Sequence, residues 1–402
     1  MSPFVLSPSA RLRTGVAKRS RRTQFWLGRI GPRACLLALV GVIFWTGLAH
    51  AWTSAQPGYV WSFPRDHWAR DGYKTEWWYF TGHLRVAEEP VPRFGFQFTF
   101  FRIGVSPDAS GGDSAWAANS IIMGHAAVTD LETGRHRFSE LVVRAAPLLA
   151  GFGRHPDPRI AWSVGPPGTP DEWQLRWNGK GFDFTMADAG KSFGFSLSTR
   201  PLKPLVFQGP GGLSRKGEGA TEASHYYSFT RMATTGTVRL EGKEWEVSGT
   251  SWMDKEFGSN QLGEDTEGWD WFSLQFDDGR EVMLYLLRNR NGGTHYAGAT
   301  LVEAGGAVRH LQPSEWKLNA TGQWTSPATG APYPAGWILD IPDAAIRAVI
   351  TPRLADQENR SSLIPNLFYW EGSVRVESGS GTRIGQGYVE LTGHGENSRP
   401  PI

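Results

Sequence analysis

The sequence predicts an all-β protein of the sandwich or barrel class, and three observations lead to this prediction. Many short runs alternate apolar and polar residues, which is the period of a strand with one buried face. Turn-forming stretches separate these runs, and the chain contains 49 glycines and 26 prolines in 402 residues. No amphipathic pattern of three or more helical turns stands out. Many short strands joined by such turns are typical of sandwiches and barrels.

Two hairpins are the clearest elements. Residues 76–86 and 94–104 are apolar runs separated by a polar, proline-bearing loop. Residues 269–276 and 280–288 flank Asp277-Asp278-Gly279, and Asp-Gly between alternating runs is a strong hairpin signal. Because each hairpin pairs a tryptophan-bearing strand with an aromatic or aliphatic one, the sequence indicates two related β-units.

Other strands are expected between and after these hairpins. The polar stretch 263–268 is the expected boundary between the two units. The glycine-rich segment 209–219 lacks the spacing of a phosphate-binding loop and is interpreted as an ordinary loop. The further strands are expected at residues 120–131, 172–179, 181–188, 191–200, 225–232, 236–254, 297–302, 337–342, 345–352, 368–377 and 385–391.

The first 51 residues have the pattern of an export signal. They carry eight basic residues and no acidic residue, and the apolar run 34–49 precedes the small-residue ending Ala49-His50-Ala51. This order predicts a signal peptide that is removed after Ala51. An uncleaved membrane anchor formed by residues 34–49 is the alternative. The segment 20–27 resembles a twin-arginine signal with one extra residue, so this export route stays open. We therefore expect an exported, periplasmic protein.

Composition limits the chemistry of the remaining chain. Residues 52–402 carry 33 basic and 39 acidic side chains, a net charge of −6, which gives no electrostatic case for nucleic acid. Cys35, the single cysteine, lies in the leader, so disulfides and thiolate catalysis are excluded after cleavage. We expect membrane contact only through the leader, or transiently. The 351 remaining residues are enough for a stable core.

Seventeen of the 19 tryptophans remain after cleavage. Large aromatic side chains bury much area, so a tryptophan-rich core is one interpretation. An aromatic-lined cavity for a lipophilic ligand is the other. Trp78, Trp269 and Trp271 are candidates for the lining of such a cavity, and core packing is the equally weighted alternative for each.

Common catalytic motifs do not occur in the sequence. The chain has no G-x-S-x-G elbow and no H-E-x-x-H motif, and its ten histidines are not at metal-ligand spacing. We therefore expect no metal and no cofactor. His125, in an apolar strand, is expected to be a hydrogen-bonded core or pocket residue. A glycosidase-like pair of carboxylates is not singled out by any pattern.

The segment 251–262, SWMDKEFGSNQL, raises a question of orientation. Side chains alternate along a strand, so Trp252, Asp254 and Glu256 share one face. If that face points inward, two carboxyls lie roughly 6.6–7 Å apart along the strand. Burial among aromatic rings would raise the pKa of one, making it a proton donor to an alkene. The alternative is a solvated strand end.

Several long motifs in this chain resemble the AttH-like lipocalin family, which also contains the carotenoid 1,2-hydratases. The resemblance runs in order from about residue 60 to 394. It implies two tandem lipocalin-like (calycin) β-barrels, over residues 58–263 and 268–396. The motifs are FPRDHWARDGYKTEWWYFTGHL, FQFTFFR, HAAVTD, FQGPGGLSRKG, HYYSFTRMATTGTV, SGTSWMDKEFGSNQL, GWDWFSLQFDDGREVMLYLLR and YWEGSVRV followed by GQGYVEL.

The resemblance also implies roles for single residues. In the hydratases an aspartate of a Tyr-x-Asp motif is thought to protonate a terminal double bond, and Asp254 matches it. Trp252 stands in the place of the tyrosine, which keeps a cation-stabilising ring and loses a hydroxyl. Tyr227 matches an aromatic position of the hydratase pocket. The resemblance thus favours an inward-facing Asp254.

Three functions follow from these expectations. The first is an exported protein that binds a lipophilic molecule, an isoprenoid or lipid, and serves an ABC-type export system. The second is a cofactor-free hydratase, a hydro-lyase in which Asp254 donates a proton to an isoprenoid double bond. The third and weakest is a secreted hydrolase. The export signal favours the first function, and Asp254 with its aromatic neighbours favours the second.

Overall fold

We examined the fold in a computed structural model that describes residues 51–87, 89–107, 118–263 and 265–400. Within these ranges the protein is all-β: it has 25 strands and four three-residue 3-10 helices, and no α-helix. Nor does any helix there have the length and apolar character needed to cross a membrane. Residues 1–50 of the predicted leader lie outside the described residues. The 3-10 helices are η1 (Arg65–His67), η2 (Pro210–Gly212), η3 (Pro313–Glu315) and η4 (Pro342–Ala344).

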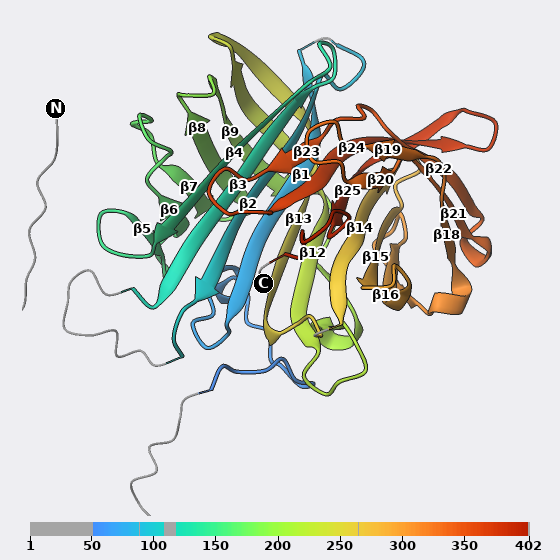
Figure 1. The fold of residues 1–402 in the computed structure, drawn as a ribbon, viewed down its shortest axis with the longest axis horizontal. Coiled ribbons are helices and arrows are strands. Elements are labelled where there is room, and N and C mark those ends of the chain that lie inside the picture. The colour runs from blue at the N-terminus through green and yellow to red at the C-terminus, as the bar shows by residue number, and fades with distance from the viewer. Residues whose placement is uncertain (1–50, 88, 108–117, 264, 401–402) are drawn as a thin grey trace, which may run out of the picture. The chain divides into compact units, whose positions relative to one another are not determined.

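Thirteen antiparallel strands form the first sheet, which curls into a nearly closed barrel (Figure 1). Neighbouring strands follow the order β4-β3-β2-β1-β13-β12-β9-β8-β7-β6-β5, and β10 and β11 pair with β12. The strands are β1 (Thr75–Val86), β2 (Phe94–Gly104), β3 (Ser120–Asp130), β4 (Arg135–Arg144), β5 (Ala150–Phe152), β6 (Arg159–Ser163), β7 (Trp173–Trp177), β8 (Phe182–Asp188), β9 (Phe193–Pro201), β10 (Val206–Phe207), β11 (Leu213–Arg215), β12 (Ala223–Leu240) and β13 (Lys243–Asn260).

Ten strands form the second sheet, a half-barrel drawn in yellow to red in Figure 1. Its order is β17-β16-β15-β14-β25-β24-β22-β21-β18, with β23 paired to β24, and β19 and β20 form a separate ribbon. The strands are β14 (Thr266–Phe276), β15 (Glu281–Asn289), β16 (Thr294–Val302), β17 (Val308–Leu311), β18 (Lys317–Ala320), β19 (Gln323–Thr325), β20 (Pro332–Pro334), β21 (Trp337–Ile341), β22 (Ile346–Pro352), β23 (Glu358–Arg360), β24 (Phe368–Ser378) and β25 (Arg383–Thr392).

The fold confirms the all-β prediction with two curled sheets and corrects its elements in two ways. Ten mostly short strands were not expected, namely β4–β6, β10, β11, β17–β20 and β23. The sequence predicted a single strand over 236–254, whereas β12 ends at Leu240 and β13 begins at Lys243. Glu241 and Gly242 form the turn between them, with φ of 53° and 78°. Both residues have positive φ, as a two-residue hairpin turn requires. The change from first to second sheet falls between Asn260 and Thr266, while the predicted domain limits stay a prediction.

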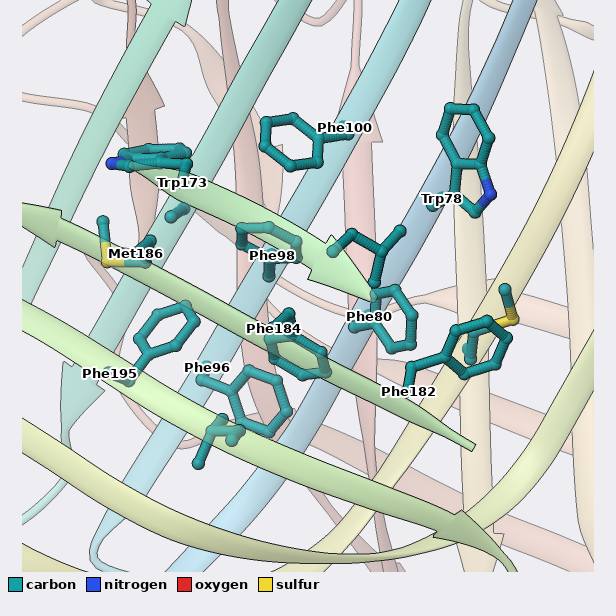
Figure 2. Close-up of a cluster of buried hydrophobic side chains, with 14 of the residues drawn as sticks. Trp78, Phe80, Phe96, Phe98, Phe100, Trp173, Phe182, Phe184, Met186 and Phe195 are labelled. Carbon is teal, nitrogen blue, oxygen red and sulfur yellow. The ribbon is translucent and has the colours of Figure 1, made fainter. Parts of the chain in front are cut away.

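Aromatic side chains fill the inside of the first sheet. Figure 2 shows this cluster, in which Phe98 and Phe184 stack with ring centroids 5.0 Å apart. Such burial is the main stabilising contribution to a chain without disulfides. The aromatic interior of this barrel is therefore a packed core. The labelled members are Trp78, Phe80, Phe96, Phe98, Phe100, Trp173, Phe182, Phe184, Met186 and Phe195.

The second sheet covers part of the outer face of the first. Strands β1 and β2 contact β25 and β24. A third apolar cluster lies at this junction and contains Tyr79 and Trp252 from the first sheet with Trp271 and Tyr388 from the second. Because both faces are covered, side chains are buried almost continuously along β1 and along residues 251–258 of β13. The two faces of β13 thus point into different surroundings.

Candidate functional site

A cavity of about 80 Å³ lies between the two sheets. Seven of its fifteen lining side chains are aromatic, and four are ionisable: Lys216, Asp254, Glu256 and Glu390. The remaining lining residues are Trp77, Tyr79, Thr99, Phe101, Tyr226, Gln261, Leu262, Trp269, Trp271, Tyr285 and Leu287.

Side chains alternate between the two faces of β13, and this places two of these acids in the cavity wall. Met253 belongs to the core of the first sheet, whereas Asp254 and Glu256 line the cavity on the opposite face. In the pairing of β13, Asp254 stands between Tyr79 of β1 and Ser228 of β12. The alternative of a solvated strand end is therefore wrong, because both faces of this stretch are buried.

Asp254 is held by three neutral hydrogen-bond donors. The Tyr226 hydroxyl donates to Oδ2 at 2.8 Å, and the indole Nε1 of Trp252 donates to Oδ1 at 2.8 Å. The Ser228 hydroxyl donates to Oδ1 as well. Burial raises the pKa of Asp254 to about 7, although these three hydrogen bonds oppose the rise. The carboxyl is therefore poised to hold or release a proton near neutral pH.

Aromatic rings surround this carboxyl. The Trp271 Nε1 donates to the Tyr226 hydroxyl at 3.1 Å, which links Asp254 to the second sheet. Trp271 also meets Tyr79 edge to face at 5.1 Å and Trp252 at 6.2 Å between ring centroids. Such rings stabilise positive charge that lies over their faces.

Glu256 belongs to a different arrangement in the same cavity. The Lys216 ammonium lies 2.9 Å from its Oε1, and the Ser224 hydroxyl donates to the same atom. Lys216 also lies 4.4 Å from the centre of the Tyr285 ring. The acid on this side of the cavity is thus paired with a cation, in contrast to Asp254.

Two further glutamates come from the second sheet. The Trp269 Nε1 donates to Oε2 of Glu390 at 2.9 Å, and the Tyr79 hydroxyl donates to Oε1 of Glu371 at 2.6 Å. Burial raises the pKa of Glu390 to about 7 and raises that of Glu371 well above its usual value, with the Glu390 charge adding to the second effect. A cluster of acids with raised pKa values is typical of a functional site.

The size of the cavity limits what it can hold. An apolar cavity of roughly 150 Å³ accommodates benzene, so about 80 Å³ has room for roughly three non-hydrogen atoms of a ligand. Trp77, Phe101, Leu262 and Trp269 line the cavity and are only partly buried. The site thus fits a small end of a molecule whose larger, apolar part lies against these four side chains.

The structure brings five of the eight predicted site residues together: Asp254, Glu256, Trp269 and Trp271 line the cavity, and Trp252 bonds Asp254. It places the other three elsewhere. Tyr227 lies on the opposite face of β12, where its hydroxyl is 2.6 Å from His67 Nδ1. Trp78 belongs to the core of the first sheet and lies over the Lys255 ammonium, 3.4 Å from its ring centre.

His125 is the third of these residues. Its Nδ1 is 2.7 Å from the Tyr369 hydroxyl of β24, and burial lowers its pKa to about 4. It is therefore a neutral, hydrogen-bonded residue of the junction between the sheets, as the sequence led us to expect for this isolated histidine. No cluster of three or more His, Cys, Asp or Glu side chains in the described part of the chain is arranged to hold a metal ion.

Sequence reasoning missed Tyr226, Lys216, Glu371 and Glu390. Tyr226 and Tyr227 are adjacent, and the pairing of β12 with β13 decides which of them faces Asp254. Lys216 follows β11 in the segment that we interpreted as an ordinary loop. Glu371 and Glu390 lie in the expected strands 368–377 and 385–391. A charged residue among aromatic and aliphatic neighbours was the sequence feature that could have identified them.

Fold and site together define an all-β protein of the lipocalin type with a buried acidic cavity between its two sheets. The chain matches the AttH-like family over residues 54–394 and belongs to that family. It is similar to the crystal structure of an AttH protein from Nitrosomonas europaea, with a TM-score of 0.73 and 31% identity over 85% of this chain and 99% of that one.

A more distant likeness concerns the fold alone. The crystal structure of kievitone hydratase from Nectria haematococca has a TM-score of 0.59 and 14% identity, over 85% of this chain and 95% of that one. No curated protein matches this chain.

Proposed function

We propose that this protein is a cofactor-free hydratase in which Asp254 donates a proton to a carbon–carbon double bond of a lipophilic substrate, an isoprenoid or a related lipid. One observation carries the proposal: a buried carboxyl with a pKa of about 7 sits in an aromatic cavity and is held by neutral donors. A carboxyl that serves only structure is normally paired with a cation, because an isolated buried acid costs stability.

The reaction would use the groups around Asp254 in order. Transfer of the Asp254 proton to one alkene carbon leaves a carbocation on the other carbon. The rings of Trp271, Tyr79 and Trp252 stabilise this cation, while the new Asp254 carboxylate offsets its charge. A water molecule then forms the carbon–oxygen bond, and the proton that it loses restores the Asp254 carboxyl. The sum is addition of one water to the alkene, with no cofactor required.

The substrate class follows from the shape of the site. A cavity of about 80 Å³ admits only the reacting end of a molecule. The apolar side chains at Trp77, Phe101, Leu262 and Trp269 favour a lipophilic body outside it. The fold likeness to a hydratase agrees with this chemistry, while the proposal depends on the residues of this chain.

The test compares the purified wild-type protein with Asp254→Asn. Each is incubated with an isoprenoid and lipid extract, and the bound and released fractions are analysed by mass spectrometry. We expect a product heavier by one water with the wild type only. Glu358→Gln, a change of another buried acid in the second sheet, serves as a control that keeps the cavity intact. A product formed equally by Asp254→Asn would exclude the proposed role of Asp254.

Binding without catalysis is the second candidate function, and the apolar rim of the cavity is the observation that favours it. A carrier would retain the same unmodified lipid in the wild type and in Asp254→Asn. Export to the periplasm and association with an ABC-type exporter also stay proposals, which rest on the leader pattern of residues 1–51. Fractionation of cells that express the full chain would test the location.

A further inference from the structure

Two acids of the second sheet form a pair at the wall of the cavity. Glu371 of β24 and Glu390 of β25 are directly opposite each other in the pairing of these strands. Opposite residues of antiparallel strands have Cβ atoms roughly 4.5–5.5 Å apart, and like charges at this separation destabilise a sheet. Glu371 is 1% exposed, and Glu390 lines the cavity. The two carboxyls therefore cannot both be ionised without a strong cost.

The hydrogen bonds of the pair leave one atom without a partner. Tyr79 donates to Oε1 of Glu371 and Trp269 donates to Oε2 of Glu390. The second oxygen of Glu371, Oε2, is buried, and no described residue bonds it. A buried carboxyl oxygen normally has a partner, which is a protein group or an ordered water. A proton on the pair, or a water beside it, would supply this partner.

The groups that face this pair do not neutralise it. Asp254 and Glu256 of β13 add negative charge near Glu390, and burial, the largest influence, also favours its neutral form. Tyr79 of β1, Tyr369 of β24 and Tyr388 of β25 face Glu371 as phenols. Lys216 lines the cavity and is paired with Glu256. Burial raises the pKa of Tyr388, and the charge of Arg353 opposes this rise. One proton on the pair removes the repulsion.

We propose that Glu371 and Glu390 share a single proton and hold the water that attacks the substrate, with Glu390 as the base that receives a proton from it. The inference rests on the proposed hydratase function and assigns it a second catalytic residue. Glu371 acts as a positioning residue, because it keeps its proton and leaves Glu390 as the carboxylate that faces the cavity.

The protons and bonds of the proposed hydration are all accounted for. Asp254 gives its proton to the alkene and becomes a carboxylate. The water oxygen bonds to the cationic carbon, and its extra proton passes to Glu390. Transfer of that proton from Glu390 to Asp254, through solvent in the cavity, restores both groups. The net reaction consumes one alkene and one water and forms one alcohol.

The shared proton can be tested without a substrate. Infrared spectra of the wild type, Glu371→Gln and Glu390→Gln are compared at about pH 7 for the carbonyl band of a protonated carboxyl. Glutamine imitates a protonated glutamate and still accepts the bond from Tyr79. Asp254 is replaced by asparagine in all three proteins, because its own carboxyl is also protonated near pH 7. In this background we expect a band that is lost in Glu371→Gln. An unchanged band in that variant would overturn the shared proton.

Thermal unfolding at about pH 8.5 provides a second, independent test of the shared proton. Glu371→Gln should unfold at the wild-type temperature or above it, because the change removes the cost of keeping a carboxyl protonated at this pH. Glu358 is the matched control in the same sheet, since Ser326, Thr329, Tyr333 and Arg360 all donate to it. Glu358→Gln should unfold at a lower temperature. A loss of stability in Glu371→Gln equal to that of Glu358→Gln would contradict the proposal.

Turnover separates this inference from the function on which it rests. If the wild type hydrates a substrate, Glu390→Gln should lower the rate about 100-fold or more, and Glu371→Gln should shift the pH profile of the rate. Full activity of Glu390→Gln would exclude its role as the base. If the wild type forms no product, the proposed function fails, while the infrared and unfolding results still decide whether the pair shares a proton.

Discussion

Asp254 and Lys255 are consecutive residues of β13 with opposite environments. Lys255 faces the first sheet, where it forms a buried ion pair with Glu76, and Arg102 bonds the same glutamate. Burial lowers the pKa of Lys255 to about 7, and the Glu76 charge opposes this change. Asp254 has three neutral donors on the other face. Lys255 and Arg102 thus pair with Glu76 in a structural network on one face of β13. Asp254, which has no cationic partner, faces the cavity on the other.

Replacement of Asp254 by asparagine should change the pH dependence of stability. The folded protein holds the Asp254 proton up to about pH 7, whereas the unfolded chain releases it near pH 4. Wild-type stability therefore falls as the pH rises between these values and levels off above pH 7. The asparagine side chain does not titrate, so the free energy of unfolding of Asp254→Asn relative to wild type should rise by roughly 3–4 kcal/mol from pH 4 to 7.

Urea unfolding at a series of pH values measures this difference. The raised pKa values of Glu371 and Glu390 act in the same direction but are present in both proteins, so they largely cancel in the comparison. A difference between the two proteins that does not vary with pH would show that Asp254 titrates normally.

Two adjacent tyrosines provide a second prediction at this scale. Tyr226→Phe removes the hydroxyl that bonds Asp254 and accepts from Trp271, and it should lower turnover about 10- to 100-fold and cost about 1–3 kcal/mol of stability. Tyr227→Phe removes the bond to His67 and should cost about 1 kcal/mol of stability with turnover retained. Steady-state rates and urea unfolding of both variants test this. The reverse pattern would place the site on the first-sheet side of β12.

The sequence alone could predict one part of this site. Alternation along β13 placed Trp252, Asp254 and Glu256 on one face, and this is confirmed. It could not decide between Tyr226 and Tyr227, because β12 and β13 pair with irregularities between Ala223 and His225 and between Phe229 and Met232. Each irregularity shifts the register, and a shift by one residue exchanges the two faces.

At the scale of elements, the strength of the turn signal decided whether a hairpin was predicted. The Asp277-Asp278-Gly279 turn was predicted, and Gly279 has the positive φ that its place requires. The Glu241-Gly242 turn was missed because glutamate rarely adopts positive φ, so the pair is a weak turn signal. As a consequence, the two 18-residue strands that support the site were not seen as a hairpin.

Gly298 of β16 makes room for Tyr285, which lines the cavity. A Cβ atom at Gly298 would lie 2.8 Å from three atoms of the tyrosine side chain. Gly298→Ala should therefore displace Tyr285, weaken its 2.5 Å bond to the Arg215 carbonyl and cost about 1–3 kcal/mol of stability. Urea unfolding measures this cost. Gly305→Ala, where a Cβ would meet open space, is the control and should change little; equal effects would show that Gly298 has no special role.

At the scale of the whole described chain, buried hydrogen bonds join the two sheets. Tyr79 bonds Glu371 at 2.6 Å, His83 lies 2.7 Å from the Ser373 hydroxyl, and His125 lies 2.7 Å from the Tyr369 hydroxyl. Such bonds are lost together when the sheets separate. The sequence could not place the cavity between the sheets, because these contacts join residues far apart in the chain.

The two sheets should therefore unfold in one transition. Tryptophan fluorescence and far-ultraviolet circular dichroism should give the same midpoint in urea. Tyr369→Phe removes the bond to His125 and should lower this common midpoint without splitting it. Two separate transitions in the wild type would show that the sheets are independent domains.

The proposed reaction begins when Asp254 adds a proton to an alkene in the cavity between the sheets. The most direct test incubates wild type and Asp254→Asn with an isoprenoid and lipid extract in water that carries a heavy oxygen isotope. We expect an alcohol that contains this oxygen with the wild type alone. The same unmodified lipid retained by both proteins would contradict it and leave a binding protein.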